Sequence, residues 1–504
     1  MVSEPDPSSV AETLPPRRLD PRTILIKVLQ NSPSFLLALP AILVASRGES
    51  AVTGLLVTGM SLLGGLILVS SWLRWRTFTY QILPGQLVIA RGLINRTRRS
   101  IPAERIQDVS IKQGPLSRLL GLAQVRIETG GGEADEGKLD SVSLSEAYRL
   151  REVLRGLRTK GAPAEAAGQK AEGEAEAILF RLGLPRLLYS GLFSFSLVWV
   201  AAIFGVGQYL NQALGYGWDQ WLDLLGVSEQ TLRSNINGPV VLAAAGLAFA
   251  VGVMAGVIRT TLRNFRFKLA YAEGRFRNSR GLLTRTEVVV AKRQIQLSLI
   301  ERGAVSGRLG WSALKVQTLG GSDHLSGRQE LAPFARSAEL APIIALAGLP
   351  PFERSLLRSV SALHGVRALV AFVLLPTVII LGATTAFPLA ALLLSTIPAP
   401  LAVALLRPRY HRYALAETSV QVSRGVLKQR DWTIPYGNIQ AVTVWRGPIQ
   451  RLLGIATVRI DTAGGRGIHT PHVHDIDVDQ ASAFVRGLLE RANNLGGTTH
   501  GNAG

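Results

Sequence analysis

The chain has 504 residues, of which 47% are hydrophobic and 18% are charged, and its formal net charge is +20 at pH 7. Soluble domains carry about 25% charged residues, so the composition favours segments buried in lipid, and the basic excess favours an anionic membrane face over nucleic acid. The chain has no cysteine, which excludes disulfide bonds, thiol nucleophiles and thiolate metal sites.

Residues 1–22 are polar and rich in Pro, Ser and acidic side chains, which predicts a disordered tail. After this tail, apolar segments occur in three pairs, most of them close to the roughly 20 residues that a transmembrane helix needs. The members of the third pair are short and contain or adjoin prolines. We therefore expect six transmembrane helices in three hairpins, at 23–73, 185–258 and 364–406.

Arg and Lys side chains flank the spans on the side of the termini and soluble segments, whereas the three hairpin tips hold only Arg47 and Arg233. Cytoplasmic flanks carry the excess of Arg and Lys in membrane proteins. The pattern predicts a multi-pass protein of the cell membrane with both termini and all soluble segments in the cytoplasm. The spans hold almost no ionisable residues, which disfavours a transporter or channel.

The three soluble segments repeat one sequence pattern. Arg280-Gly281-Leu282 lies 189 residues after Arg91-Gly92-Leu93, and Arg424-Gly425-Val426 lies a further 144 residues on. The same offsets align Ile-Gln pairs that begin at Ile106, Ile295 and Ile439. An ungapped register over about fifty residues in three copies indicates one module used three times.

Within each copy, alternating apolar and polar residues predict short antiparallel strands, as at Val125, Ile127 and Thr129. A helix-like segment closes each copy, at 145–157, 333–346 and 479–491. The fold class is thus membrane helical hairpins plus α+β, with soluble modules at 74–159, 263–348 and 409–494. The stretch at 160–178 is rich in Gly, Ala, Glu and Lys, which predicts a linker.

These motifs resemble the bacterial pleckstrin-homology-like (PH-like) domain, and their triplication resembles the YdbT-like membrane proteins. The first copy carries Arg91-Gly92-Leu93, Ile101-Pro102, Ile106-Gln107, a turn from Gly114 to Gly121 and the strand from Val125 to Thr129. The middle copy departs from the pattern at Val290-Ala291 and Arg308. The resemblance implies a partly open antiparallel barrel capped by a C-terminal helix, no enzymatic activity, and a role in cell-envelope stress.

Two groups of basic residues recur in all three copies. One lies at the turn and one on a late strand: Arg91, Arg280 and Arg424, then Arg126, Lys315 and Arg459. They are candidate contacts for lipid phosphates or an acidic partner. The plainer interpretation is a solvated face next to a turn that defines the fold, because single surface charges contribute little.

We find no constellation that supports catalysis. The stretch from Gly132 to Lys138 nearly matches a phosphate-binding loop, but Leu139 replaces the required Ser or Thr. A cluster around His472, His474 and Asp475 lacks metal-ligand spacing and is absent from the other copies. We therefore expect no catalytic residue, cofactor or metal site.

The hypothesis is a non-enzymatic integral membrane protein that presents three cytoplasmic PH-like modules at the inner leaflet. The modules would serve self-association, protein binding or binding of anionic membrane lipids, and no nucleic acid is expected. The alternative is a transporter or channel with its pore between the hairpins. An enzyme that uses the His and Asp cluster is the third hypothesis.

Overall fold

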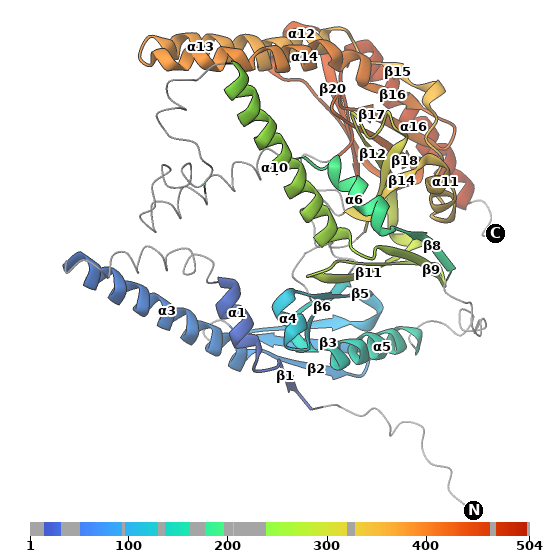
Figure 1. The fold of residues 1–504 in the computed structure, drawn as a ribbon. Coiled ribbons are helices and arrows are strands. Elements are labelled where there is room, and N and C mark those ends of the chain that lie inside the picture. Colours follow the sequence, from blue (N-terminus) through green and yellow to red (C-terminus); the bar gives the residue numbers. More distant parts are fainter. Residues whose placement is uncertain are drawn as a thin grey trace, which may run out of the picture.

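The computed structural model describes residues 15–31, 51–92, 96–129, 137–160, 177–195, 205, 238–319, 328–463 and 470–500. In Figure 1 the three soluble modules lie one above another, the first at the bottom and the third at the top. The apolar helices α3, α10 and α13 extend from them toward the left of the view.

The first module begins with a four-stranded antiparallel sheet in the order β1-β2-β3-β4. Its strands are β1 (Arg17–Arg18), β2 (Thr79–Leu83), β3 (Gln86–Arg91) and β4 (Thr97–Pro102). The expected turn follows β3, and the glycine after each repeated arginine has a φ of 106°, 109° or 112°. A Cβ at Gly281 would collide with the carbonyl of Thr284, so only glycine fits this turn.

The second sheet has seven strands and spans two modules. Its order is β7-β6-β5-β11-β10-β9-β8. The first module contributes β5 (Ile106–Gln113), β6 (Leu122–Thr129) and β7 (Gly137–Ser143). The second contributes β8 (Ala177–Arg181), β9 (Lys268–Ala272), β10 (Arg275–Arg280) and β11 (Arg285–Ala291). Strand β5 pairs antiparallel with β11, so one sheet crosses the module boundary.

The third sheet repeats this arrangement in the order β14-β13-β12-β18-β17-β16-β15. The second module contributes β12 (Ile295–Gly303), β13 (Trp311–Thr318) and β14 (Arg328–Arg336). The third contributes β15 (Arg358–Ser359), β16 (Arg412–Leu415), β17 (Ser419–Arg424) and β18 (Lys428–Pro435). A final three-stranded sheet holds β19 (Ile439–Trp445), β20 (Ile455–Thr462) and β21 (His472–Asp477).

A helix closes each module, as the sequence predicts: α5 (Leu144–Lys160), α11 (Ser337–Leu346) and α16 (Val478–His500). The middle helix starts later than expected, because residues 333–336 continue strand β14. Short helices link β5 to β6 and β19 to β20, namely α4 (Pro115–Leu119) and α15 (Pro448–Leu452). One 3-10 turn precedes β5, β12 and β19 at Ala103–Arg105, Lys292–Gln294 and Tyr436–Asn438. Each module therefore has the expected antiparallel strands and C-terminal helix.

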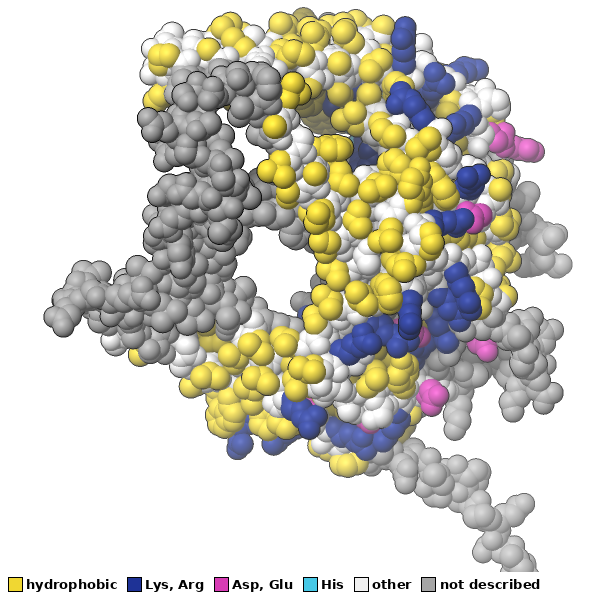
Figure 2. Space-filling view, in the orientation of Figure 1, with side chains coloured by type: hydrophobic (Ala, Val, Ile, Leu, Met, Phe, Trp, Pro, Cys, Tyr) yellow, Lys and Arg dark blue, Asp and Glu magenta, His cyan; other side chains and the backbone are white. Residues whose placement is uncertain are grey.

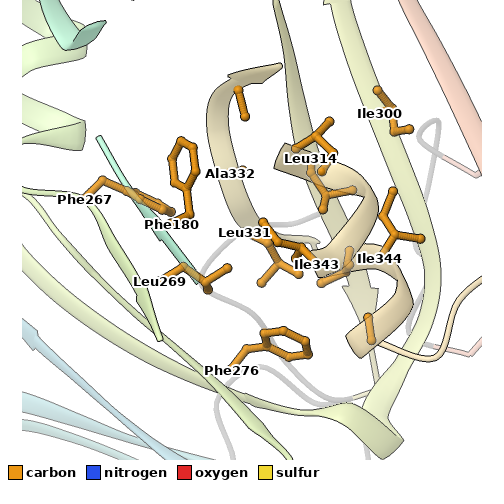
Figure 3. Packing of buried hydrophobic residues seen from close by; sticks show 14 of the residues in the cluster. Phe180, Phe267, Leu269, Phe276, Ile300, Leu314, Leu331, Ala332, Ile343 and Ile344 are labelled. Carbon is orange, nitrogen blue, oxygen red and sulfur yellow. The ribbon is translucent and has the colours of Figure 1, made fainter. Parts of the chain in front are cut away.

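The core of each module lies between its two half-sheets and the closing helix. Figure 3 shows the middle core, where Leu269 and Phe276 from one sheet, with Phe267 just before β9, face Leu314 and Leu331 from the next. Ile343 and Ile344 of α11 close the same cluster. Burial of such side chains contributes about 1.5–3 kcal/mol each.

Two helices within the described ranges are long and apolar enough to cross a membrane, at Ala245–Asn264 and Leu363–Thr384. The first belongs to α10 (Gly238–Asn264), and the second comprises α12 (Leu363–Leu369), a π turn at Val370–Leu374 and α13 (Leu375–Thr384). Within the described ranges, the hairpins also contain the α-helices α1 (Thr23–Asn31), α3 (Ala51–Thr77), α6 (Leu184–Leu192) and α14 (Pro398–Tyr410).

The described part of the chain thus shows two such helices rather than the six expected. Residues 32–50 and most of 196–237 belong to the first and second hairpins and lie outside the described residues. The last expected span is split into a 3-10 segment, Pro388–Thr396, and the 13-residue α14. Its prolines explain the split, because they lack the N–H that a continuous helix needs.

A strand precedes each hairpin, which the sequence did not predict. Strands β1, β8 and β15 pair with the first strands after the hairpins, β2, β9 and β16. The segment expected to be a disordered tail at 1–22 instead contains strand β1, and Leu19 is buried in the first core, whereas residues 1–14 lie outside the described residues. The Trp75 indole donates a 2.8 Å hydrogen bond to the Leu19 carbonyl, which fixes this segment beside α3.

Candidate functional site

The first group of basic candidates lies at the ends of β3, β10 and β17, each just before the glycine of the turn. Arg91 is exposed at the end of β3, whereas Arg280 and Arg424 are half-buried. Arg280 forms an ion pair with Glu330. Arg424 donates to Nε2 of His474 at 3.0 Å, and burial lowers its pKa to about 10. Two of these three arginines therefore bond within the chain.

The second group occupies equivalent places on β6, β13 and β20. Arg126 is half-buried. Lys315 pairs with Glu301 at 2.7 Å, and Arg459 pairs with Asp461 at 2.7 Å. The structure brings Arg280 and Lys315 together around Glu330, but it distributes the six candidates over three modules. They do not form one continuous surface.

A cavity of about 680 Å³ lies where α10 meets the sheet shared by the first two modules. One stripe of α10 lines it, with Val251, Met254, Ala255, Ile258 and Leu262 spaced as on one helix face. Met254 is 62% exposed and Ile258 53%, so the apolar wall continues onto the surface of the candidate span. We call this cavity the α10 pocket.

Basic side chains gather at the other end of the α10 pocket. Its lining includes Lys112, Arg259, Arg263 and Arg280 and no acidic residue. Figure 2 shows hydrophobic side chains following α10 and Lys and Arg side chains gathered near its lower end, over β5 and β11. The pocket therefore combines an apolar wall with a cationic end.

Glu330 lies next to the α10 pocket and organises its arginines. It pairs with Arg280 and, at 3.3 Å, with Arg263. Burial would raise the pKa of Glu330, but the charges of Arg280, Arg263 and Lys315 outweigh burial and hold its pKa below the usual value. Glu330 is one carboxylate beside the four basic side chains that line the pocket, so the pocket carries a net positive charge that attracts an anion.

A second cavity of about 840 Å³ shares Arg259 and Arg263 with the α10 pocket. Its lining also contains Lys315 and Lys428, but Glu301 and Glu330 are there as well. These carboxylates would repel an anionic ligand. The α10 pocket is therefore the better site for a phosphate group.

An ion pair ties the first helix of each hairpin to its own module. Lys27 of α1 pairs with Asp140 of β7 at 2.5 Å, and Arg186 of α6 pairs with Glu339 of α11 at 2.9 Å. In the third unit, Nε of Arg367 is 2.6 Å from Asp475. These contacts set the direction in which each hairpin leaves its module.

The third of these contacts involves Asp475, which the sequence singled out together with His472 and His474, and it brings in two further histidines, His364 and His411. Nδ1 of His364 lies 2.6 Å from Asp475, and the backbone N–H of His474 donates to Nε2 of His411 at 3.3 Å. Burial and the charge of Arg424 lower the pKa of His474 to about 3. A neutral His474 is consistent with its accepting the hydrogen bond from Arg424.

Asp475 is fully buried and has a φ of 55°. Burial would raise the pKa of Asp475, but hydrogen bonds from His364, Gln450 and Arg367 outweigh it and hold the pKa below the usual value. Among the residues that the structure describes, no group of three or more His, Asp or Glu side chains could hold a metal ion. In this cluster, polar side chains of α12 bond to Asp475 of β21 and connect the helix to the sheet.

Sequence reasoning missed the α10 pocket, although it singled out Arg280. The pocket forms from α10, β11 and Lys112 of the preceding module. Lys112 lies opposite Thr286 in the shared sheet, and nothing in the repeat indicates that pairing. A cue was present in Arg259 and Arg263, which follow the apolar run of α10 one helical turn apart.

Comparison with known proteins identifies the repeated module. The model of the bacterial PH domain family matches residues 34–158 and 368–492, with the middle module between the two segments. The UPF0699 transmembrane protein YdbT of Bacillus subtilis (strain 168) is 26% identical over 267 residues, 51% of this chain. The chain spans about half the length of that curated relative, 52%. No solved structure matches. The chain is a bacterial PH domain protein and a YdbT-like membrane protein.

Proposed function

We propose that the protein is a non-enzymatic membrane scaffold whose second PH-like module binds the phosphate of an anionic lipid in the α10 pocket. The observation that carries this proposal is the lining of that pocket, which joins an apolar stripe of α10 to four basic side chains. A lipid has the same two parts, an acyl chain and a phosphate.

The proposed topology follows the sequence analysis. Three helical hairpins cross the membrane, and the termini and all three modules lie on its cytoplasmic side, where anionic lipids attract basic residues. Arg259 and Arg263 sit near the end of α10 that joins the modules, the level at which headgroups lie. The shared sheets hold the three modules in a fixed order at that surface.

The test uses the full-length protein in a neutral detergent, titrated with phosphatidylglycerol or phosphatidylcholine, with binding read by native mass spectrometry at low and high salt. We expect selective phosphatidylglycerol binding that persists at high salt. The variant Lys112→Gln with Arg259→Gln should bind at least about tenfold more weakly, because a charge-assisted hydrogen bond contributes about 1.5–3 kcal/mol.

The matched control is Arg105→Gln with Arg451→Gln, which removes the same charge from two exposed positions outside the pocket. It should bind phosphatidylglycerol as the unmodified protein does. Equal loss in both double variants would mean that net charge alone attracts the lipid, and the pocket would not be a site. Unselective binding of phosphatidylcholine would refute the phosphate part of the proposal.

A further inference from the structure

Equivalent strands join neighbouring modules in the same register. At the first joint, Glu287 of β11 lies opposite Ile111 of β5. At the second, Asp431 of β18 lies opposite Ile300 of β12. The repeat offsets of 144 and 189 residues carry Glu287 onto Asp431 and Ile111 onto Ile300. The chain therefore makes one type of joint twice.

The strands at the two ends of this series each have one open edge in the described structure. By the same offsets, β4 of the first module corresponds to β11 and β18, and β19 of the third corresponds to β5 and β12. β4 is the last strand of its sheet, and so is β19. Each end of the series thus presents one of the two strands that a further joint would need, β4 at one end and β19 at the other.

Positions that the joints bury are uncovered at these edges. Leu299 is fully buried and Ile300 is 9% exposed in β12. Their equivalents in β19, Thr443 and Val444, are both exposed, Val444 at 48%. Trp445 next to them is 59% exposed. An exposed edge strand with large apolar side chains is a site for pairing with another strand.

We propose that two copies of the chain join head to tail, with β19 of one copy paired antiparallel to β4 of the next. The register of the two internal joints then places Thr443 opposite Arg99 and Val444 opposite Arg98 of the next copy. A second copy is the fitting occupant because it presents the strand type that β19-type edges already bind twice within the chain.

The side chains of the two edges suit this pairing. Arg98 stands where the internal joints have the acids Glu287 and Asp431. The proposed register puts Arg98 opposite the uncharged Val444. On the other face of the sheet it puts Arg99 diagonal to Trp445, within reach of a cation–π contact. Such a contact is heterologous, so the copies either close into a ring or extend into a filament. The proposed pairing of β19 with β4 does not depend on lipid binding.

The test exploits the absence of cysteine from the chain. Two differently tagged full-length copies, one with Arg99→Cys and one with Thr443→Cys, are co-expressed and oxidised in isolated membranes. Directly opposite residues lie within disulfide distance, so we expect a covalent dimer that carries both tags. Thr286→Cys with Lys112→Cys in one chain reports the same chemistry at an internal joint, where these residues lie opposite each other.

Two comparisons decide the outcome. Arg99→Cys with Val444→Cys is slipped by one residue, which turns one side chain to the other face, and it should cross-link several-fold less. Adding Val444→Lys should abolish dimers because it places two cations opposite each other, whereas Val444→Glu should preserve them. Equal cross-linking in register and slipped pairs, or none while the internal pair forms, would overturn the proposal.

Discussion

Leu299 and Trp432 lie directly opposite each other across the joint between the second and third modules, and neither side chain reaches solvent. Leu299 belongs to the second module in sequence, yet it packs in the hydrophobic core of the third, together with Leu297. Neighbouring modules therefore share a core as well as a sheet.

Leu299→Ala should destabilise the third module although it changes the second. A buried Leu→Ala change costs about 2–5 kcal/mol through lost burial and the cavity left behind. Leu452, 87% exposed on α15, provides a control of the same type, and Leu452→Ala should change the stability by less than about 0.5 kcal/mol. Denaturant unfolding in detergent measures both. Equal losses of stability in the two variants would mean that burial of Leu299 at the joint contributes nothing to the stability of the third module.

The isolated third module, residues 409–500, should be poorly stable and prone to aggregate. Removing the second module exposes the edge of β18 and leaves the buried Asp431 without its partner Arg302. A fragment of residues 177–500 retains this joint and should unfold at a clearly higher temperature. Size-exclusion chromatography and thermal unfolding make the comparison. A monomeric module 409–500 as stable as the longer fragment would contradict it.

The second joint should weaken in acid because of Glu301. Burial would raise the pKa of Glu301, but Lys315 and Lys428 outweigh it and lower the pKa from 4.5 to about 2. The stability from the carboxylate is therefore present above pH 4.5 and lost as pH falls through about 2.

Glu301→Gln should cost on the order of 3 kcal/mol near neutral pH. The difference in stability between the variant and the unmodified protein should stay constant down to about pH 5 and disappear at lower pH. Thermal unfolding of both proteins at pH 7, 4 and 2.5 measures that difference. A difference independent of pH would show that Glu301 acts through packing rather than charge.

Asp475→Asn should loosen the start of the third hairpin. The variant keeps the shape of the side chain and tolerates positive φ, but it removes the charge that His364 and Arg367 contact. Breaking a buried ion pair costs about 3–5 kcal/mol. Hydrogen exchange should rise over Leu363–Leu369. Asp461→Asn breaks a half-exposed pair with Arg459 and should leave exchange there unchanged.

Cysteine labelling should place the modules and the third hairpin tip on opposite sides of the membrane. Thr385 follows α13 and Arg105 precedes β5, and both are exposed. Thr385→Cys should react with an impermeant maleimide in intact cells. Arg105→Cys should react only after the cells are opened. Labelling of Arg105→Cys from outside would reverse the proposed orientation.

Much of each module was predictable because its signals are local. The glycines after Arg91, Arg280 and Arg424 need positive φ, and alternation marks strands such as Val125 to Thr129. The resemblance to a PH-like domain is confirmed by the family match. Each repeat motif and each turn is specified by a few neighbouring residues, so the sequence alone was enough to predict them.

The joints and the pocket were not predictable, because alternation shows which face of a strand is buried but not which strand lies beside it. Nothing near Ile300 indicates that Asp431, more than a hundred residues later, is its neighbour. Strands of two residues, such as Arg17–Arg18, are too short to leave a periodic signal. The ion pair of Arg280 likewise depends on Glu330, which only the fold brings close.

The strands before the hairpins have a mechanical consequence. The strand before each hairpin pairs with the strand after it, so both ends of the hairpin join the same sheet. These pairs are β1 and β2, β8 and β9, and β15 and β16. In the proposed topology, a helix pair held in this way could not tilt to follow a thinner bilayer without bending that sheet. The sheets of the second and third hairpins also contain strands of the preceding module, so a tilt of either hairpin would strain that module and couple bilayer thickness to the spacing of the modules.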